Sequence, residues 1–426
     1  MLKKRISLSE NFIFSIPVLA ISFLPLLTGN ISRIFGGGIY FVIVMALMVF
    51  AAVAGELHIT GERKPILIAY AIIVVLTLIY GILLQIFDKE TALQEAMGFP
   101  VHPILYSILI NDIPIWTACT LTFLRLGDRD SENVFGVLMV LMLYTVVISI
   151  VALSFYPEFA RRLAASLSTP KMQRFVKLGG TGYSYIYTLS IIIPFLFVYF
   201  KKTRHFLALA VSVLGIIMVF KGAFIIAMVC LVLNILVFLF LNIKNNFVRI
   251  SLLVLTIGIA ITIVLEIEPI GKWLIQFSET VKSEDVGTHI LQIGKLFAYN
   301  DSTGSSLDRF ELYFQAIKNI SAYPITGYLW FGTALCGHSA VMDLWGAIGF
   351  LAPVLYVFML VLIYRYVKRL TNDKLVLNVT LSALFTFFIV SLLNPVFSSP
   401  EILLSVLFIL PLGVKGICSG RGRVVL

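Results

Sequence analysis

The sequence predicts an all-α polytopic integral membrane protein with about 12 transmembrane helices and a large, partly helical extracytoplasmic loop. Two observations predict this class. Hydrophobic residues make up 60% of the 426 residues and charged residues only 13%. Long apolar runs recur along the whole chain, and about 20 apolar residues let a helix cross the hydrocarbon layer of a bilayer. We therefore expect one polytopic membrane domain over residues 1–426.

The predicted spans follow the apolar runs in chain order: 12–28, 37–55, 65–87, 103–124, 134–155, 182–200, 206–220, 222–241, 250–267, 339–363, 376–393 and 401–417. The run from Phe206 to Leu241 is too long for one crossing, so Lys221 and Gly222 are expected in a turn between two spans.

Charged residues within or beside the spans give further expectations. Asn111 and Asp112 lie inside the run 103–124 and are followed by Pro114. Because a charge in lipid costs several kcal/mol, this helix is expected to be interrupted, with Asp112 in the protein interior or a wet cavity. Either a functional role or a structural polar contact explains Asp112. Asp343 is expected near the outer boundary, where a side chain that reaches water explains it as well as a functional role does.

Basic residues gather in short segments between the apolar runs. The positive-inside rule assigns these segments to the cytoplasm, together with the N- and C-termini. Two longer loops, at 156–180 and 268–338, then face outward, and the first is rich in basic residues. The formal net charge is +10, but the basic residues form no continuous basic face, so a nucleic-acid partner is not expected. The four cysteines are scattered and imply no disulfide framework.

The loop 268–338 contains a predicted amphipathic helix that begins near Asp308. Asp308 and Glu311 have the spacing of a helix-starting cap. Four apolar residues then recur at the spacing of one helix face: Phe310, Tyr313, Phe314 and Ile317. Arg309 would project from the first turn, where free backbone N–H groups also favour an anion such as a diphosphate. A solvated helix whose Arg309 pairs with Glu311 or a lipid phosphate explains the same residues.

The motifs downstream of this helix suggest a family. The turn YPITGY (323–328) is followed by GHS (337–339), which opens a predicted span containing GAIGF (346–350). This order, over roughly residues 306–355, resembles the O-antigen polymerase and O-antigen ligase superfamily. Asparagine is frequent in that family at the position of Ser339.

The resemblance implies a polymerase that joins undecaprenyl-diphosphate-linked oligosaccharide repeat units into a surface polysaccharide, O-antigen of lipopolysaccharide or capsule. The reaction would take place at the outer face of a bacterial cytoplasmic (inner) membrane. Such a metal-independent glycosyltransferase needs no cofactor, because the glycosyl diphosphate bond is already activated. The expected partners are the lipid-linked oligosaccharides, membrane lipid, and a chain-length regulator and flippase of the same pathway.

Two other functions remain open. An O-antigen ligase would move the finished glycan to a lipid core. From another class, a flippase would transport the lipid-linked oligosaccharide. A flippase is expected to spread charges through a central cavity and to keep its loops short.

The expected site draws on both outward loops. Arg309 is the candidate to stabilise the diphosphate leaving group, since electrostatic stabilisation is often the largest catalytic contribution. His338 is the candidate base for the acceptor hydroxyl, although it could also hydrogen-bond the diphosphate or cap the next span. The substrate-binding candidates are Arg161, Arg162, Arg174, Glu311, Tyr313, Tyr328 and Asp112. The basic residues could equally contact phospholipid headgroups, and the aromatic residues could belong to the interfacial belt.

Overall fold

The computed structural model describes residues 61–88, 94–96, 99–164, 167, 169–251, 254, 266–280, 284–299 and 305–420. The predicted spans 12–28 and 37–55, and most of 250–267, lie outside the described residues. Within them the chain is helical apart from one short hairpin. Strands β1 (Gln94–Ala96) and β2 (Phe99–Val101) pair antiparallel, with Ala96 opposite Phe99.

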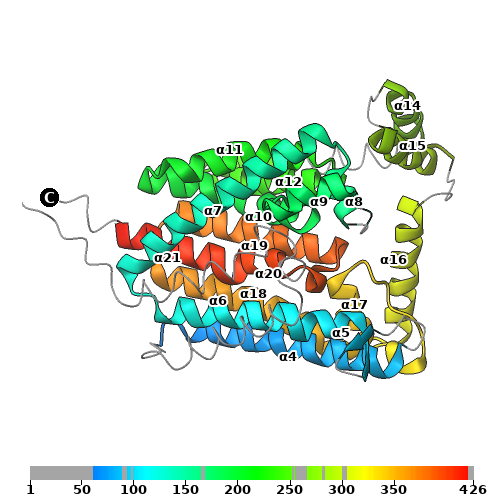
Figure 1. The fold of residues 1–426 in the computed structure, drawn as a ribbon, viewed down its shortest axis with the longest axis horizontal. Coiled ribbons are helices and arrows are strands. Elements are labelled where there is room, and N and C mark those ends of the chain that lie inside the picture. The colour runs from blue at the N-terminus through cyan, green and yellow to red at the C-terminus, as the bar shows by residue number, and fades with distance from the viewer. Residues whose placement is uncertain are drawn as a thin grey trace, which may run out of the picture.

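Long apolar helices lie alongside one another through the length of the molecule (Figure 1). In the described part of the chain, eight are long and apolar enough to cross a membrane. In chain order they are α4 (Lys64–Phe87), the unit of α5 (Pro103–Ser107), η1 (Ile108–Asp112) and α6 (Ile113–Arg125), α7 (Asp128–Phe155), α10 (Tyr183–Thr203), α12 (Ile225–Asn242), α18 (Leu351–Leu370), α19 (Lys374–Leu393), and the unit of α20 (Pro400–Leu404), η4 (Ser405–Ile409) and α21 (Leu410–Gly420). A helical membrane protein is thereby confirmed, whereas a total of twelve spans stays a prediction.

The centre of the bundle is formed by α10 and the α20–η4–α21 unit. Nearly all side chains of α10 between Tyr185 and Tyr199 are buried, and α10 packs against α12, α19, α20 and α21. The surrounding helices α4, α7, α12 and α18 instead expose apolar side chains on their outer faces, such as Val75 and Val140. Apolar residues therefore lie both inside and around the bundle, as a lipid-facing surface requires.

The interruption expected at Asn111 and Asp112 is confirmed, and it takes the form of a π-helical turn. Residues Ile108–Asp112 form η1, and Asp112 is fully buried. Pro114 has no backbone N–H to donate to the preceding turn, and a π-helical turn is one way for a helix to continue past such a defect. The turn expected at Lys221 and Gly222 is also present, because α11 (Phe206–Lys221) ends there and α12 begins at Ile225.

The predicted span 339–363 is wrong in its boundaries, because the helix is divided at Gly349. A short helix, α17 (Ala340–Ile348), ends there, and α18 begins at Leu351. Gly349 has a φ of +90°, and a Cβ at this position would lie 1.8 Å from the carbonyl oxygen of Ile325. The preceding loop thus passes directly against the bend, and the apolar crossing starts at Leu351.

Both predicted outward loops lie at the same end of the bundle, on the right in Figure 1, which we call the loop end. Loop 156–180 forms α8 (Phe159–Ala164) and α9 (Pro170–Lys177). Loop 268–338 forms α14 (Ile267–Thr280), α15 (Glu284–Tyr299), α16 (Ser305–Ala322) and the short η2 (Leu329–Phe331). Helix α16 runs across the loop end, roughly perpendicular to the long helices (Figure 1). The loop end therefore collects the segments in which the sequence places most of its candidate site residues.

Candidate active site

The motif-bearing segments of the loop end are packed around α17. The turn 323–328 lies against the C-terminal half of this helix, where the N–H of Tyr328 donates to the carbonyl oxygen of Gly346 at 2.7 Å. Gly327 has a φ of +79°, and a Cβ there would lie 2.4 Å from the same oxygen. These glycines let two backbones approach closely, so the turn and the GAIGF segment form one packed unit.

Asp343, in the first turn of α17, holds the loop that precedes the helix. Only 2% of its side chain is exposed, and Oδ1 accepts the N–H of Gly337 at 3.0 Å. The backbone of Cys336 and Ser339 also interacts with the carboxyl group. Burial raises the pKa of Asp343 to about 7, although these backbone contacts act in the opposite direction. The expectation that Asp343 reaches water is therefore wrong.

His338 lies in this same loop, directly before Ser339, which caps α17 by accepting the N–H of Met342 at 3.1 Å. The hydroxyl group of Tyr313 lies 3.3 Å from the carbonyl oxygen of His338 and 3.0 Å from that of Leu393. The side chain of His338 is half-buried. Tyr313 thus ties α16 to the beginning of α17 and the end of α19, and this junction fixes the backbone position of His338.

The predicted start of the loop helix is wrong. Helix α16 begins at Ser305, so Asp308 lies inside it and cannot be its cap. Arg309 consequently lies in the second turn, where its N–H belongs to the intrahelical ladder, so free N–H groups of a helix end do not assist it. Its side chain lies outside the described residues, and its role stays a prediction.

The face that α16 turns to the protein also differs from the expected one. Ala316 and Ile320 are buried and Tyr313 is half-buried, whereas Phe314 is 72% exposed and Ile317 is exposed as well. Glu311 is exposed on the same helix. Among the described side chains of the predicted apolar face, Tyr313 alone points to the bundle, because the inward face follows the spacing 313, 316 and 320.

The basic residues of loop 156–180 have different surroundings. Nη2 of Arg161 donates to the carbonyl oxygen of Ala223 at 2.8 Å, and its guanidinium carbon lies 6.0 Å from the ring centroid of Phe224. Arg162 is exposed and pairs with Glu158 at 2.6 Å. Arg161 therefore stabilises the turn between α11 and α12, while Arg162 contributes a surface ion pair.

Helix α9 presents a basic face at the loop end. Met172 and Val176 are buried on one side of this helix. Lys171, Arg174 and Lys177 are exposed and recur at intervals of three residues. Arg174 and the two lysines are thus available to bind an anion. This anion could belong to a lipid headgroup or to a substrate.

Tyr328 is fully buried, and a Cβ at Gly346 would lie 2.7 Å from its ring. Its hydroxyl group approaches the backbone of Cys336 without forming a hydrogen bond within the described residues. The ring therefore supports α17 from within, and substrate binding by Tyr328 stays a prediction.

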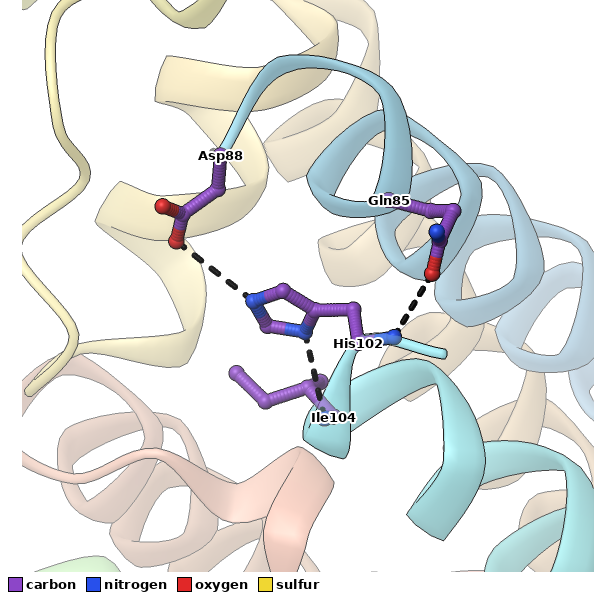
Figure 2. Close-up of polar contacts among 4 residues, drawn as sticks. All are labelled: Gln85, Asp88, His102 and Ile104. Carbon is purple, nitrogen blue, oxygen red and sulfur yellow. Dashed lines mark hydrogen bonds and ion pairs between the residues drawn. The ribbon is translucent and has the colours of Figure 1, made fainter. Parts of the chain in front are cut away.

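Sequence reasoning missed a pair formed by a histidine and a carboxylate, His102 and Asp88 (Figure 2). Nε2 of His102 lies 3.4 Å from Oδ2 of Asp88, and Nδ1 accepts the N–H of Ile104 at 3.2 Å. The N–H of His102 donates to Oε1 of Gln85 at 2.6 Å. Because Nδ1 is an acceptor, the proton of a neutral ring is on Nε2, facing Asp88.

His102 therefore acts as a structural residue. Its side chain is only 1% exposed, and both ring nitrogens face protein groups. It caps α5, and with Gln85 and Asp88 it ties the β1–β2 hairpin to the end of α4. The signal in the sequence is Pro103, because proline is common at the first position of a helix and marks the preceding residue as its cap.

Asp112, the remaining predicted site residue, lies in the core of the bundle and not among the loop-end residues around α17. It is close enough to Glu401 of α20 for an electrostatic interaction. Sequence reasoning did not connect these two carboxyl groups, because no local pattern relates η1 to α20.

Comparison with known proteins adds no relative. No protein-family model matches the chain, and no curated protein sequence matches it. The resemblance over residues 306–355 therefore depends on the order of motifs alone.

Proposed function

We propose that the protein is a membrane glycosyltransferase that joins polyprenyl-diphosphate-linked oligosaccharide repeat units into a polysaccharide. One observation carries the proposal: the turn 323–328 folds back onto the C-terminal half of α17, the short helix that contains the start of the GAIGF motif. His338 directly precedes this helix, and its carbonyl oxygen is contacted by Tyr313 of α16.

The proposed reaction assigns a role to each part of this end. The base, His338, accepts the proton of the acceptor sugar hydroxyl, the hydroxyl oxygen bonds to the anomeric carbon of the donor, and the lipid diphosphate departs with the electrons of the broken C–O bond. Negative charge grows on the diphosphate, so nearby cations stabilise the transition state. Arg309 on α16 and the basic face of α9, which includes Arg174, supply cations for this role.

Exposed apolar side chains support a substrate that carries a lipid tail. Phe314 and Ile317 on α16, with Ile325 and Phe331 in the following turn, are exposed at the loop end. Such a surface fits contact with the bilayer, where a polyprenyl chain would lie. The proposed acceptor and donor would both reach the loop end from the membrane.

A flippase for the same lipid-linked oligosaccharide is the second candidate. It is favoured by one observation, the two buried carboxyl groups of Asp112 and Glu401 inside the bundle. Ionisable residues inside spans often belong to transport or proton pathways. A ligase would use the same chemistry as the polymerase with a different acceptor.

The deciding measurement is the glycan profile of cells that lack the protein, by gel electrophoresis and mass spectrometry. A single repeat unit on the lipid acceptor indicates a polymerase. Full-length chains left on undecaprenyl diphosphate indicate a ligase, and repeat units trapped at the cytoplasmic face indicate a flippase. An unchanged profile would exclude all three.

Complementation of these cells tests the residues. We expect His338→Ala to restore no polymer although the variant inserts at the wild-type level. His205→Ala is the matched control, because His205 is half-buried and also precedes a helix, α11, but at the opposite end of the bundle. Arg309→Ala should also restore none, and Arg309→Lys little, because lysine lacks the two-pronged contact of a guanidinium with phosphate. Normal polymer from an alanine variant removes that residue from the mechanism.

A further inference from the structure

Two carboxyl groups from distant parts of the chain lie close together in the bundle core. Asp112 is the last residue of η1, and Glu401 is the second residue of α20. Their side chains are 0% and 5% exposed. The segments meet because α20 packs against α6, which continues from η1, and because η1 packs against the short helix η3 (Val396–Ser398) that leads into α20.

The two carboxyl groups differ in their hydrogen bonding. Neither oxygen of Asp112 has a hydrogen-bond partner within the described part of the chain. Glu401 interacts with the hydroxyl group of Ser184 and with its own backbone N–H. No ion pair among the described residues includes either carboxyl group. A buried carboxylate without donors or a cation is costly, and the cost rises when a second carboxylate is near.

Other charges in the surroundings are remote from the pair. The elements that pack on η1 and α20 are α4, α5, α6, α10, η3 and η4. Their fixed charges lie at the end of the bundle opposite the loop end: Lys64, Arg125, Lys201 and Lys202. Their other titratable groups are tyrosines and Cys119, which are neutral near pH 7. Within these elements, Glu401 is therefore the charged group that acts on Asp112.

We propose that Asp112 and Glu401 form a proton-binding site in which Asp112 is protonated at neutral pH and Glu401 carries the charge. The assignment follows from the donors, because only Glu401 has groups that stabilise a carboxylate. A proton also fits the pair better than a metal ion. The described residues contain no group of three or more metal-ligating side chains, whereas the common divalent metals in proteins take four or more ligands.

Polar contacts lie on the Glu401 side of the pair. Ser184, which contacts Glu401, is preceded in α10 by Tyr183, whose hydroxyl group donates to Oδ1 of Asn394 at 2.5 Å. The carbonyl oxygen of Asn394 accepts the N–H of Ala340 at 3.1 Å, at the start of α17.

Apolar packing lies on the other side of the pair. Beyond Asp112 along α6, Phe123 is fully buried, and its ring lies 6.4 Å from that of Phe408, which follows Glu401 in η4. The proposed proton binding is independent of whether the protein transfers glycans.

Infrared spectroscopy of the full chain in lipid nanodiscs tests the proposal directly. At about pH 8.5, above the pKa of about 7 of Asp343, we expect a carboxylic-acid C=O band from Asp112. Labelling with [4-¹³C]aspartate should shift this band in the unmutated protein, so the test does not depend on a variant that folds. Asp112→Asn should remove the band. Asp373→Asn is the control and should keep it, because Asp373 pairs with Lys202 at 2.5 Å and is ionised.

The second carboxyl group has its own test. Glu401→Gln removes the neighbouring charge, so the Asp112 band should disappear at a lower pH than in the wild type. A band that is insensitive to aspartate labelling, or that persists in Asp112→Asn, overturns the assignment to Asp112. An unchanged titration in Glu401→Gln overturns the pairing. A band that appears only after sodium is replaced by choline would mean a cation site instead.

Discussion

Asp343 shows how one buried carboxyl group determines the shape of a loop. It lies inside the first turn of α17, and the chain before the helix wraps around it through the N–H of Gly337. Such a group stabilises the loop geometry while its own burial opposes ionisation. His338 belongs to this loop, so Asp343 helps to hold the backbone on which the candidate base lies.

The stability of the protein should depend on pH through Asp343. Its pKa is raised from 3.8 to about 7 in the folded state, so the folded protein binds this proton more tightly than the unfolded chain. The stabilising contribution of Asp343 is full below about pH 4. It is lost as pH rises through about 7, which lowers the free energy of unfolding by up to about 4 kcal/mol. The thermal midpoint of the wild type should fall over this range relative to that of Asp343→Asn. Parallel curves for the two proteins would contradict the prediction.

Loss of the hydroxyl group should change the stability of the protein differently at two tyrosines of the loop end. Tyr313→Phe removes the contacts with the carbonyl oxygens of His338 and Leu393 and should lower the free energy of unfolding by about 1 kcal/mol. Tyr328→Phe removes a buried hydroxyl group that has no hydrogen-bond partner among the described residues, and it should leave stability unchanged or slightly higher. Thermal unfolding of both variants in detergent checks this contrast. An equal loss in both would mean that the Tyr328 hydroxyl group is also bonded.

At the scale of the elements, the packing of α17 depends on backbone approach. The turn 323–328 passes so close to the end of α17 that only glycine fits at Gly349. The same contact ends α17 and starts α18. A single close approach therefore sets both the length of the short helix and the start of the long one.

Two glycine variants separate this packing from backbone strain. Gly349 and Gly332 both have positive φ values, so alanine at either costs about 1–2 kcal/mol in strain. A Cβ at Gly349 also meets the Ile325 oxygen at 1.8 Å, whereas nothing lies within 4 Å at Gly332. We expect Gly349→Ala to lose at least about 2 kcal/mol more than Gly332→Ala in chemical denaturation. Similar losses would show that the loop can move away from the bend.

Elements bounded by charges could be predicted well from the sequence. The run 376–393 corresponds to α19 (Lys374–Leu393), and 65–87 to α4 (Lys64–Phe87), because Lys374 and Lys64 end the apolar segments. The division at Gly349 could not be predicted, since it depends on a tertiary contact with Ile325. The start of α16 was missed because the Asp308–Glu311 spacing of a cap lies inside the helix, which begins at Ser305.

The candidate site was predictable only in part. The motif order singled out 323–328, His338 and 346–350 as a family resemblance, and the turn 323–328 packs against α17, which His338 precedes. The tie from Tyr313 to Leu393 and the approach of Asp112 to Glu401 join residues far apart in the chain. No periodicity or spacing in one sequence specifies such pairs. The role of His102 was visible in principle, through the following Pro103.

At the scale of the whole molecule, the loop end and the opposite end differ in character. The loop end carries the helices of both long loops, whereas short turns dominate the opposite end (Figure 1). The basic segments that the positive-inside rule assigns to the cytoplasm belong to these short turns. The proposed function requires that the loop end face outward.

Cysteine accessibility tests this orientation. Lys171 on α9 and Lys368 on α18 are both exposed lysines at opposite ends. A membrane-impermeant maleimide should label Lys171→Cys in intact cells and Lys368→Cys only after permeabilisation. The native cysteines Cys119, Cys230 and Cys336 are buried and should give little background. The reverse pattern would place the loop end in the cytoplasm and exclude the proposed polymerase.

The division of the chain at Gly349 also determines how deep α17 and α18 lie in the bilayer. Helix α18 has 20 residues, and at 1.5 Å per residue it matches the hydrocarbon layer of about 30 Å. The nine residues of α17 then lie among the headgroups, and Trp330 and Trp345 beside them are typical of that zone. A phosphate attached to a lipid tail occupies the same level, so it could meet His338 without being lifted from the bilayer. The vertical position of the proposed chemistry would then be set by the length of a helix that contributes none of the candidate residues.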